Sequence, residues 1–88
     1  MKFRFSGALL RYVNYRKEIE LDAPTLGSAF EKLALECPLL ASVMYDGRGN
    51  VQSAHRLFLG EEMIRDFDPQ LALKNTDCIE VVTTSAGG

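Results

Sequence analysis

Residues 25–38 read TLGSAFEKLALECP, and this stretch has the pattern of one amphipathic helix. Thr25 is a good N-cap, because its hydroxyl can accept one of the backbone N–H groups left unpaired in the first turn. Apolar residues recur at helical spacing at Leu26, Ala29, Phe30, Leu33 and Cys37. Pro38 cannot continue the hydrogen-bond ladder, so the helix is expected to end near it.

Two short segments before this helix have the alternation of strands. In residues 2–6, KFRFS, the two phenylalanines fall on one side, and residues 17–21, KEIEL, alternate in the same way. Gly7 and Asn14 are turn candidates in the connection between them. These two segments therefore predict an antiparallel hairpin.

The chain after the helix contains further expected strands. Residues 39–53 carry turn dipeptides and are interpreted as a loop that could hold a short helical or strand piece. Residues 55–59, HRLFL, predict a third strand, and residues 63–64 add a very short one. Residues 78–84, CIEVVTT, are rich in β-branched side chains and predict the last strand.

The order of these elements limits the architecture. A single amphipathic helix must bury its apolar side against the one sheet available. A helix that leaves the second strand can cross over and set a later strand parallel to the first, which places the first and last strands inside the sheet. We therefore expect an α+β protein with a mixed four- to five-stranded sheet and one main helix packed on one face, the β-grasp arrangement of ubiquitin-like proteins. The expected domain spans residues 1–84, and residues 85–88 form a flexible C-terminal tail that ends in two glycines.

The composition excludes several classes of function. The 88 residues include 10 basic and 12 acidic side chains, a net charge of −2, which argues against a dedicated nucleic-acid binder. No apolar run is long enough to span a bilayer and no signal peptide is visible, so we expect a cytoplasmic protein without a membrane partner. Residues 1–17 carry five bases and no acid, and this basic segment is either a solvated face or a contact for an acidic partner.

No set of residues forms a catalytic constellation. The single histidine, His55, has no serine or cysteine placed by a motif as its nucleophile. The two cysteines fit no zinc pattern, since Cys37 lies on the apolar side of the helix and Cys78 begins a strand. The carboxylates near turns are interpreted as solvated charges: Glu61, Glu62, Asp66 and Asp68. We expect no enzymatic activity of the chain itself, no bound cofactor and no metal site.

The C-terminus is the unusual feature of the sequence. The last strand runs into a small, uncharged tail of Ser85, Ala86, Gly87 and Gly88. A C-terminal carboxylate becomes reactive when an enzyme adenylates it with ATP, and the tail must then thread a narrow channel to the nucleotide. Glycine suits such a channel, because it has no Cβ and takes backbone angles that other residues avoid. The pattern therefore predicts a reactive terminus at Gly88.

With these features the sequence resembles the bacterial sulfur-carrier proteins of the ubiquitin-like superfamily. This type includes the small subunit of molybdopterin synthase, the thiamine-pathway carrier and the cysteine-pathway carriers. The likeness spans nearly the whole chain and is most specific at Gly87-Gly88. Its other parts are Phe3-Arg4-Phe5, the helix start at Thr25 with Leu26, Phe30 and Leu33, Pro38, Leu57-Phe58-Leu59-Gly60, and Asn75-Thr76-Asp77 before Ile79-Glu80-Val81. The stretch Thr83-Thr84-Ser85 departs from the pattern, since many of these carriers have proline there.

The resemblance implies a cycle in which partner proteins supply the catalytic groups. An E1-like adenylating enzyme activates the carboxylate of Gly88 with ATP, and a persulfide sulfur-donor protein converts it to a thiocarboxylate. An acceptor synthase then receives the sulfur in a molybdopterin-, cysteine- or thiamine-type pathway. A peptidase would be a further partner if the natural chain extends past Gly88 and is trimmed to expose Gly-Gly.

Strand alternation predicts where such partners dock. If Ile79 and Val81 face the helix, then Val82 and Thr84 face outward, with Phe58 of another strand beside them. Exposed aromatic side chains beside polar ones are typical interface anchors. We therefore expect a partner interface at Phe58, Val82 and Thr84, next to the tail.

Three other functions fit the same residues. A ubiquitin-like modifier would join its Gly88 to target lysines by an isopeptide bond. A plain β-grasp binding domain would not use the Gly-Gly end at all. A small subunit of a two-protein synthase would keep its tail inserted in the large subunit.

Overall fold

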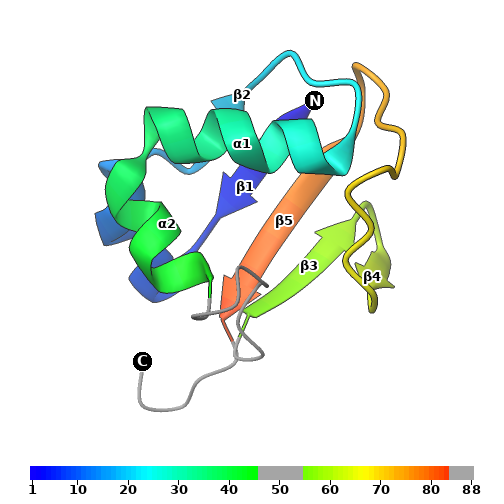
Figure 1. Ribbon diagram of the computed structural model, residues 1–88. Coiled ribbons are helices and arrows are strands. Elements are labelled where there is room, and N and C mark those ends of the chain that lie inside the picture. Colours follow the sequence, from blue (N-terminus) through cyan, green and yellow to red (C-terminus); the bar gives the residue numbers. More distant parts are fainter. Residues whose placement is uncertain (46–54, 84–88) are drawn as a thin grey trace.

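The computed structural model describes residues 1–45 and 55–83 (Figure 1). Along the chain, the elements are β1 (Lys2–Phe5), the 3₁₀ helix η1 (Gly7–Val13), β2 (Glu18–Glu20), α1 (Leu26–Glu36), α2 (Pro38–Met44), β3 (His55–Leu59), β4 (Glu62–Ile64) and β5 (Cys78–Thr83). Every strand that the sequence predicts is present. No helix among the described residues is long and apolar enough to cross a membrane.

The five strands form one mixed sheet in the order β2-β1-β5-β3-β4. β1 pairs antiparallel with β2 and parallel with β5, so Phe3 lies opposite Ile19 on one side and Ile79 on the other. β3 is antiparallel to both β5 and β4. The first and last strands are therefore neighbours inside the sheet, and α1 lies across one face (Figure 1). This confirms the β-grasp prediction.

Helix α1 begins and ends where its local sequence signals indicate. Thr25 and Ser28 form a capping box, in which the Ser28 N–H donates to the Thr25 hydroxyl (3.2 Å) and the Thr25 N–H donates to the Ser28 hydroxyl (3.2 Å). The apolar side of the helix is buried at Leu26, Ala29, Phe30 and Leu33. The Phe30 ring meets that of Phe3 edge to face, with centroids 5.0 Å apart. Helix α1 therefore packs against β1 through the contact between Phe30 and Phe3.

Two further helical segments lie between the elements that the sequence predicts. The link between β1 and β2 is the 3₁₀ helix η1, which buries Leu9 and Val13 and ends at Asn14 in the left-handed region (φ 55°). Pro38 ends α1 and also opens α2, since proline fits the first turn of a helix, where its missing N–H is not needed. Residues 39–44 are therefore helical. They correspond to the short helical piece that the sequence allows within residues 39–53.

The segment between β4 and β5 is tied to the start of α1. The N–H of Leu26 donates to the Leu71 carbonyl (2.9 Å), and that of Gly27 donates to the Pro69 carbonyl (3.0 Å). These bonds satisfy two donors of the first helical turn that have no partner inside the helix. The core itself lies between the sheet and the helices, and its largest fully buried side chains are Phe3, Phe5, Val13, Leu26, Leu33, Leu40, Met44, Ile79 and Val81.

Candidate functional site

The strand that leads to the C-terminus is firmly held. β5 lies between β1 and β3, and its Ile79 and Val81 side chains have no exposed surface. Its last described residue, Thr83, lies opposite His55 at the start of β3. The expected reactive Gly88, the tail residues Ser85, Ala86 and Gly87, and the expected interface residue Thr84 lie outside the described residues. What the structure provides is a fixed strand immediately before them.

One face of the sheet, opposite the helices, carries the other expected interface residues, and we call it the open face. Because Ile79, Val81 and Leu57 are buried toward the helices, their strand neighbours Phe58 and Val82 point to the open face. Both are half-buried. The predicted orientation of these strands is confirmed.

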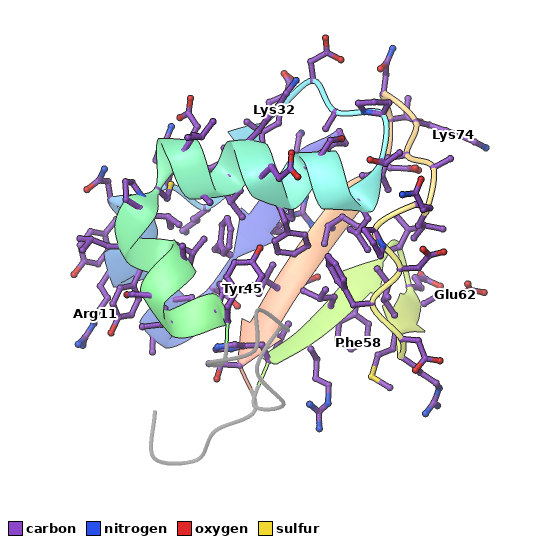
Figure 2. All side chains as sticks on the ribbon, viewed as in Figure 1. Arg11, Lys32, Tyr45, Phe58, Glu62 and Lys74 are labelled. Atoms are coloured by element: carbon purple, nitrogen blue, oxygen red, sulfur yellow. The ribbon has the colours of Figure 1, made fainter. Side chains whose placement is uncertain are left out.

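A continuous row of side chains crosses the open face. Phe58 lies opposite Glu80 on β5 and opposite Met63 on β4, and Glu80 in turn lies opposite Arg4 on β1. Val82 lies opposite Arg56, which places it diagonally from Phe58. The open face therefore holds a small apolar centre at Phe58, Met63 and Val82 with charged neighbours, and Figure 2 shows Phe58 on its strand.

The β1–β2 side of the open face is an ion-pair cluster. The Arg4 guanidinium donates to the Glu18 carboxylate (2.8 Å), and the Lys2 ammonium lies 3.5 Å from the same carboxylate. The hydrogen bond from Arg4, aided by the charge of Lys2, lowers the pKa of Glu18. The same hydrogen bond raises the pKa of Arg4. A groove of about 400 Å³ beside this cluster is lined by Arg4, Phe5, Ser6, Lys17, Glu18 and Glu80.

His55 joins α2 to the sheet. Its Nε2 lies 2.8 Å from the Val43 carbonyl, so Nε2 carries the proton and donates, because a carbonyl only accepts. The other ring nitrogen, Nδ1, is buried without a hydrogen-bond partner. The sequence gives no signal for this contact, which spans 12 residues. His55 therefore has a structural role at the end of the sheet from which the tail departs.

The remaining candidate residues take ordinary structural positions. Cys37 is buried in the core, and its sulfur accepts from the Arg16 guanidinium at 3.6 Å. Cys78 is half-buried at the start of β5. Asp68 accepts a hydrogen bond from the Gln70 N–H (2.9 Å), which is the geometry of an Asx turn. Within residues 1–45 and 55–83, no group of three or more acidic, histidine or cysteine side chains is placed to hold a metal ion.

Comparison with known proteins supports the fold. No protein-family model matches the chain, and no curated protein matches it. Among solved structures, a chain of the Amycolatopsis orientalis BexX/CysO complex matches with a TM-score of 0.83 at 12% identity, over 99% of this chain and 98% of that chain. SAMP1 from Haloferax volcanii matches with a TM-score of 0.78 at 18% identity, over 99% of this chain and 97% of that chain. Urm1 from Sulfolobus solfataricus matches with a TM-score of 0.73 at 19% identity, over 94% of this chain and 99% of that chain.

These solved structures share the fold of the described residues. They are ubiquitin-like sulfur-carrier and modifier proteins, the kind that the sequence resembles. Identities this low describe a shared fold, and each likeness covers nearly all of both chains. The protein therefore has the ubiquitin-like β-grasp fold.

Proposed function

We propose that this protein is a sulfur carrier. An E1-like enzyme adenylates the Gly88 carboxylate, and the terminus is then converted to a thiocarboxylate for use in biosynthesis. The observation that carries the proposal is the path of β5, a buried strand inside a β-grasp sheet that is followed directly by a small tail ending in Gly87-Gly88. The likeness to a chain of the BexX/CysO complex supports the same class.

The chemistry needs only the terminal carboxylate of this chain. Its oxygen attacks the α-phosphate of ATP and pyrophosphate leaves, which gives an acyl-adenylate. The outer sulfur of a donor persulfide attacks the acyl carbon and AMP leaves. A thiol then cleaves the resulting acyl disulfide, which leaves the thiocarboxylate on Gly88 and a disulfide on the donor side. The activating enzyme and the donor protein supply the nucleotide site and the sulfur.

A short tail after β5 suits a mechanism in which the partner proteins supply the catalytic groups. Five residues follow Thr83, and an extended chain of five spans at most about 17 Å. Thr83 belongs to β5, which pairs with β1 at residues 78–81 and with β3 at residues 79–83. A partner can therefore take the tail into a channel while the folded domain docks at the channel mouth.

The open face is the proposed docking surface for the activating enzyme. Phe58, Met63 and Val82 form its apolar centre. Glu80 and Arg56 provide charged neighbours. Aromatic anchors surrounded by polar groups concentrate binding energy in protein interfaces. The face also lies on β5 itself, so a partner bound there meets the strand that leads to Gly88.

A second candidate function is protein modification through Gly88. The likeness to SAMP1, a small archaeal modifier protein, favours it. Modification would use the same adenylate, but a target lysine would attack the acyl carbon in place of a persulfide. The product would be an isopeptide bond, and no sulfur would remain on the carrier.

The test combines purified protein, its activating enzyme, ATP and a persulfide donor, with intact mass as the measurement. We expect a species in which one oxygen of Gly88 is replaced by sulfur, and fragment masses should localise the exchange to that residue. A chain lacking Gly88 is the matched control, because it keeps the whole β-grasp domain and should stay unmodified.

The other outcomes identify the alternatives. Lysine-linked conjugates of the wild-type chain in cell extracts, absent for the chain lacking Gly88, indicate a modifier. A carboxylate that stays unmodified with every partner present contradicts both functions and leaves a β-grasp binding domain.

A further inference from the structure

Glu80 is a half-buried carboxylate in the middle of the open face. Its strand neighbours Ile79 and Val81 are fully buried toward the helices, so the Glu80 side chain points to the open face. β5 is the middle strand of the sheet, with β3 and β4 on one side and β1 and β2 on the other. Glu80 therefore lies between the apolar centre of the open face and the ion-pair cluster.

The two cations beside Glu80 make their hydrogen bonds to other groups. Arg4 lies opposite Glu80 on β1, but its Nε and Nη2 both donate to the Glu18 carboxylate, at 3.3 and 2.8 Å. Arg56 lies diagonally from Glu80 on β3 and donates to the His55 carbonyl (3.4 Å). Neither of these guanidinium groups is therefore held by Glu80.

The charge of Glu80 is not paired within the part of the chain that the structure describes. The ion pairs among residues 1–45 and 55–83 involve the carboxylates of Glu18 and Glu36 and leave Glu80 out. The hydrogen bond to Glu18 is the main cause of the raised pKa of Arg4, and the charge of Glu80 is the smallest contribution that raises it. A half-buried carboxylate has lost part of its hydration, and a cation from another molecule would compensate for that loss.

The other strand neighbour of Glu80 is an aromatic ring. Phe58 on β3 lies directly opposite Glu80 on β5, and side chains in that relation are about 5 Å apart at Cβ. A guanidinium group can stack on an aromatic face and also pair with a carboxylate through two parallel N–H···O bonds. A lysine ammonium would reach the carboxylate only as a point charge, without a planar surface to lay on the ring. Phe58 and Glu80 together therefore fit an arginine.

We propose that the activating enzyme docks on the open face by placing one of its arginines against Phe58 and Glu80. This inference rests on the proposed sulfur-carrier function and adds the chemistry of the contact between carrier and enzyme. Met63 and Val82, the other members of the apolar centre, lie beside this position and exclude water from it when the enzyme is bound. The charge of Glu80 also attracts the enzyme before contact, which makes the association sensitive to salt.

The test measures pyrophosphate release by the activating enzyme at increasing concentrations of the purified full chain. Glu80→Gln keeps the size of the side chain and removes its charge. We expect the KM for the carrier to rise roughly 10-fold with little change in kcat, as for the loss of one interfacial charge pair. Added salt should raise the KM of the wild-type chain more steeply than that of Glu80→Gln.

Glu20→Gln is the matched control. Glu20 is an exposed carboxylate on the edge strand β2, opposite Lys2 and outside the apolar centre. Its loss should leave both the KM and the salt dependence as in the wild-type chain. Urea unfolding checks that Glu80→Gln is as stable as the wild type, which is expected because the carboxylate has no hydrogen-bond partner to lose.

A double-mutant cycle identifies the arginine of the enzyme. Among Arg→Gln variants of the enzyme, one should raise the KM of the wild-type chain by about the same factor as Glu80→Gln does, and it should add little to the KM of Glu80→Gln itself. An unchanged KM for Glu80→Gln, an equal rise for Glu20→Gln, or the absence of any coupled enzyme arginine overturns the proposal.

Failure of this contact is distinguishable from failure of the sulfur-carrier function. If the wild-type chain gains sulfur at Gly88 while Glu80→Gln keeps the wild-type KM, the function stands and the arginine contact is wrong. A wild-type chain that the enzyme never adenylates overturns both.

Discussion

Gly27 lies directly against Pro69, so closely that a methyl group at residue 27 would come within 2.8 Å of the Pro69 Cβ and 3.0 Å of its carbonyl oxygen. The contact brings the start of α1 and the segment before β5 close enough for the Gly27 N–H to donate to the Pro69 carbonyl (3.0 Å). Glycine is needed here for the close approach of two backbones.

Gly27→Ala should therefore destabilise the protein, although the same change usually stabilises a helix by about 1 kcal/mol. Overpacking against a backbone carbonyl costs about 1–3 kcal/mol, which exceeds the helical gain. Urea unfolding measures the difference. In a Pro69→Gly background, where the Cβ contact is absent, the loss should be smaller. A variant as stable as the wild-type chain contradicts the steric argument.

The elements that could be predicted from the sequence are those specified by local signals. β1, β3 and β5 alternate or are rich in β-branched residues, and α1 has an N-cap at Thr25 and a stop at Pro38. The architecture could be predicted because a single amphipathic helix must bury its apolar side against the one available sheet. The orientation of Phe58 and Val82 on the open face followed from strand alternation in the same way.

What could not be predicted depends on tertiary contacts. α2 has seven residues, too few for a helical period to stand out, and it is helical because Leu40 and Met44 are buried in the core. The same holds for η1, where Leu9 and Val13 are buried. No residue pattern in the sequence indicates the contact between His55 and α2. The roles of Thr84 and of residues 85–88 stay predictions.

His55→Ala should lower the free energy of unfolding by about 1 kcal/mol, the usual value of one hydrogen bond. The variant loses the Nε2 donor to the Val43 carbonyl, which holds the end of α2 to the start of β3. Amide hydrogen exchange should become faster in α2 than in α1. His55→Gln keeps an N–H donor and should retain part of the stability. Equal stability of His55→Ala and the wild-type chain would show that the contact contributes nothing.

Phe58→Arg should slow adenylation of Gly88 by roughly 30-fold or more, as expected when a central aromatic anchor worth about 2 kcal/mol is lost from an interface. The fold should persist, because an arginine at this position lies opposite Glu80 and forms a favourable cross-strand pair. Pyrophosphate release with the activating enzyme gives the rate. Leu35→Arg, on α1 and away from the open face, is the matched control. An unchanged rate for Phe58→Arg excludes the open face as the docking surface.

Glu18→Gln should reduce stability slightly at neutral pH and have little effect in acid. The Arg4 hydrogen bond and the Lys2 charge lower the pKa of Glu18 in the folded protein below its ordinary value of 4.5. A lowered folded-state pKa means that the stabilisation is present above the unfolded-state pKa and is lost as the pH falls through the folded-state pKa. Unfolding curves at about pH 7 and about pH 3 should therefore show a gap in the free energy of unfolding between variant and wild type, and this gap should close in acid.

The gap at neutral pH should also shrink when salt is added, because the pair is exposed. Glu20→Gln, on the same strand, is the control and should change less, since the cations Lys2 and Arg4 both lie at Glu18. A gap of the same size at both pH values would mean that the carboxylate stabilises the sheet through packing and not through its charge.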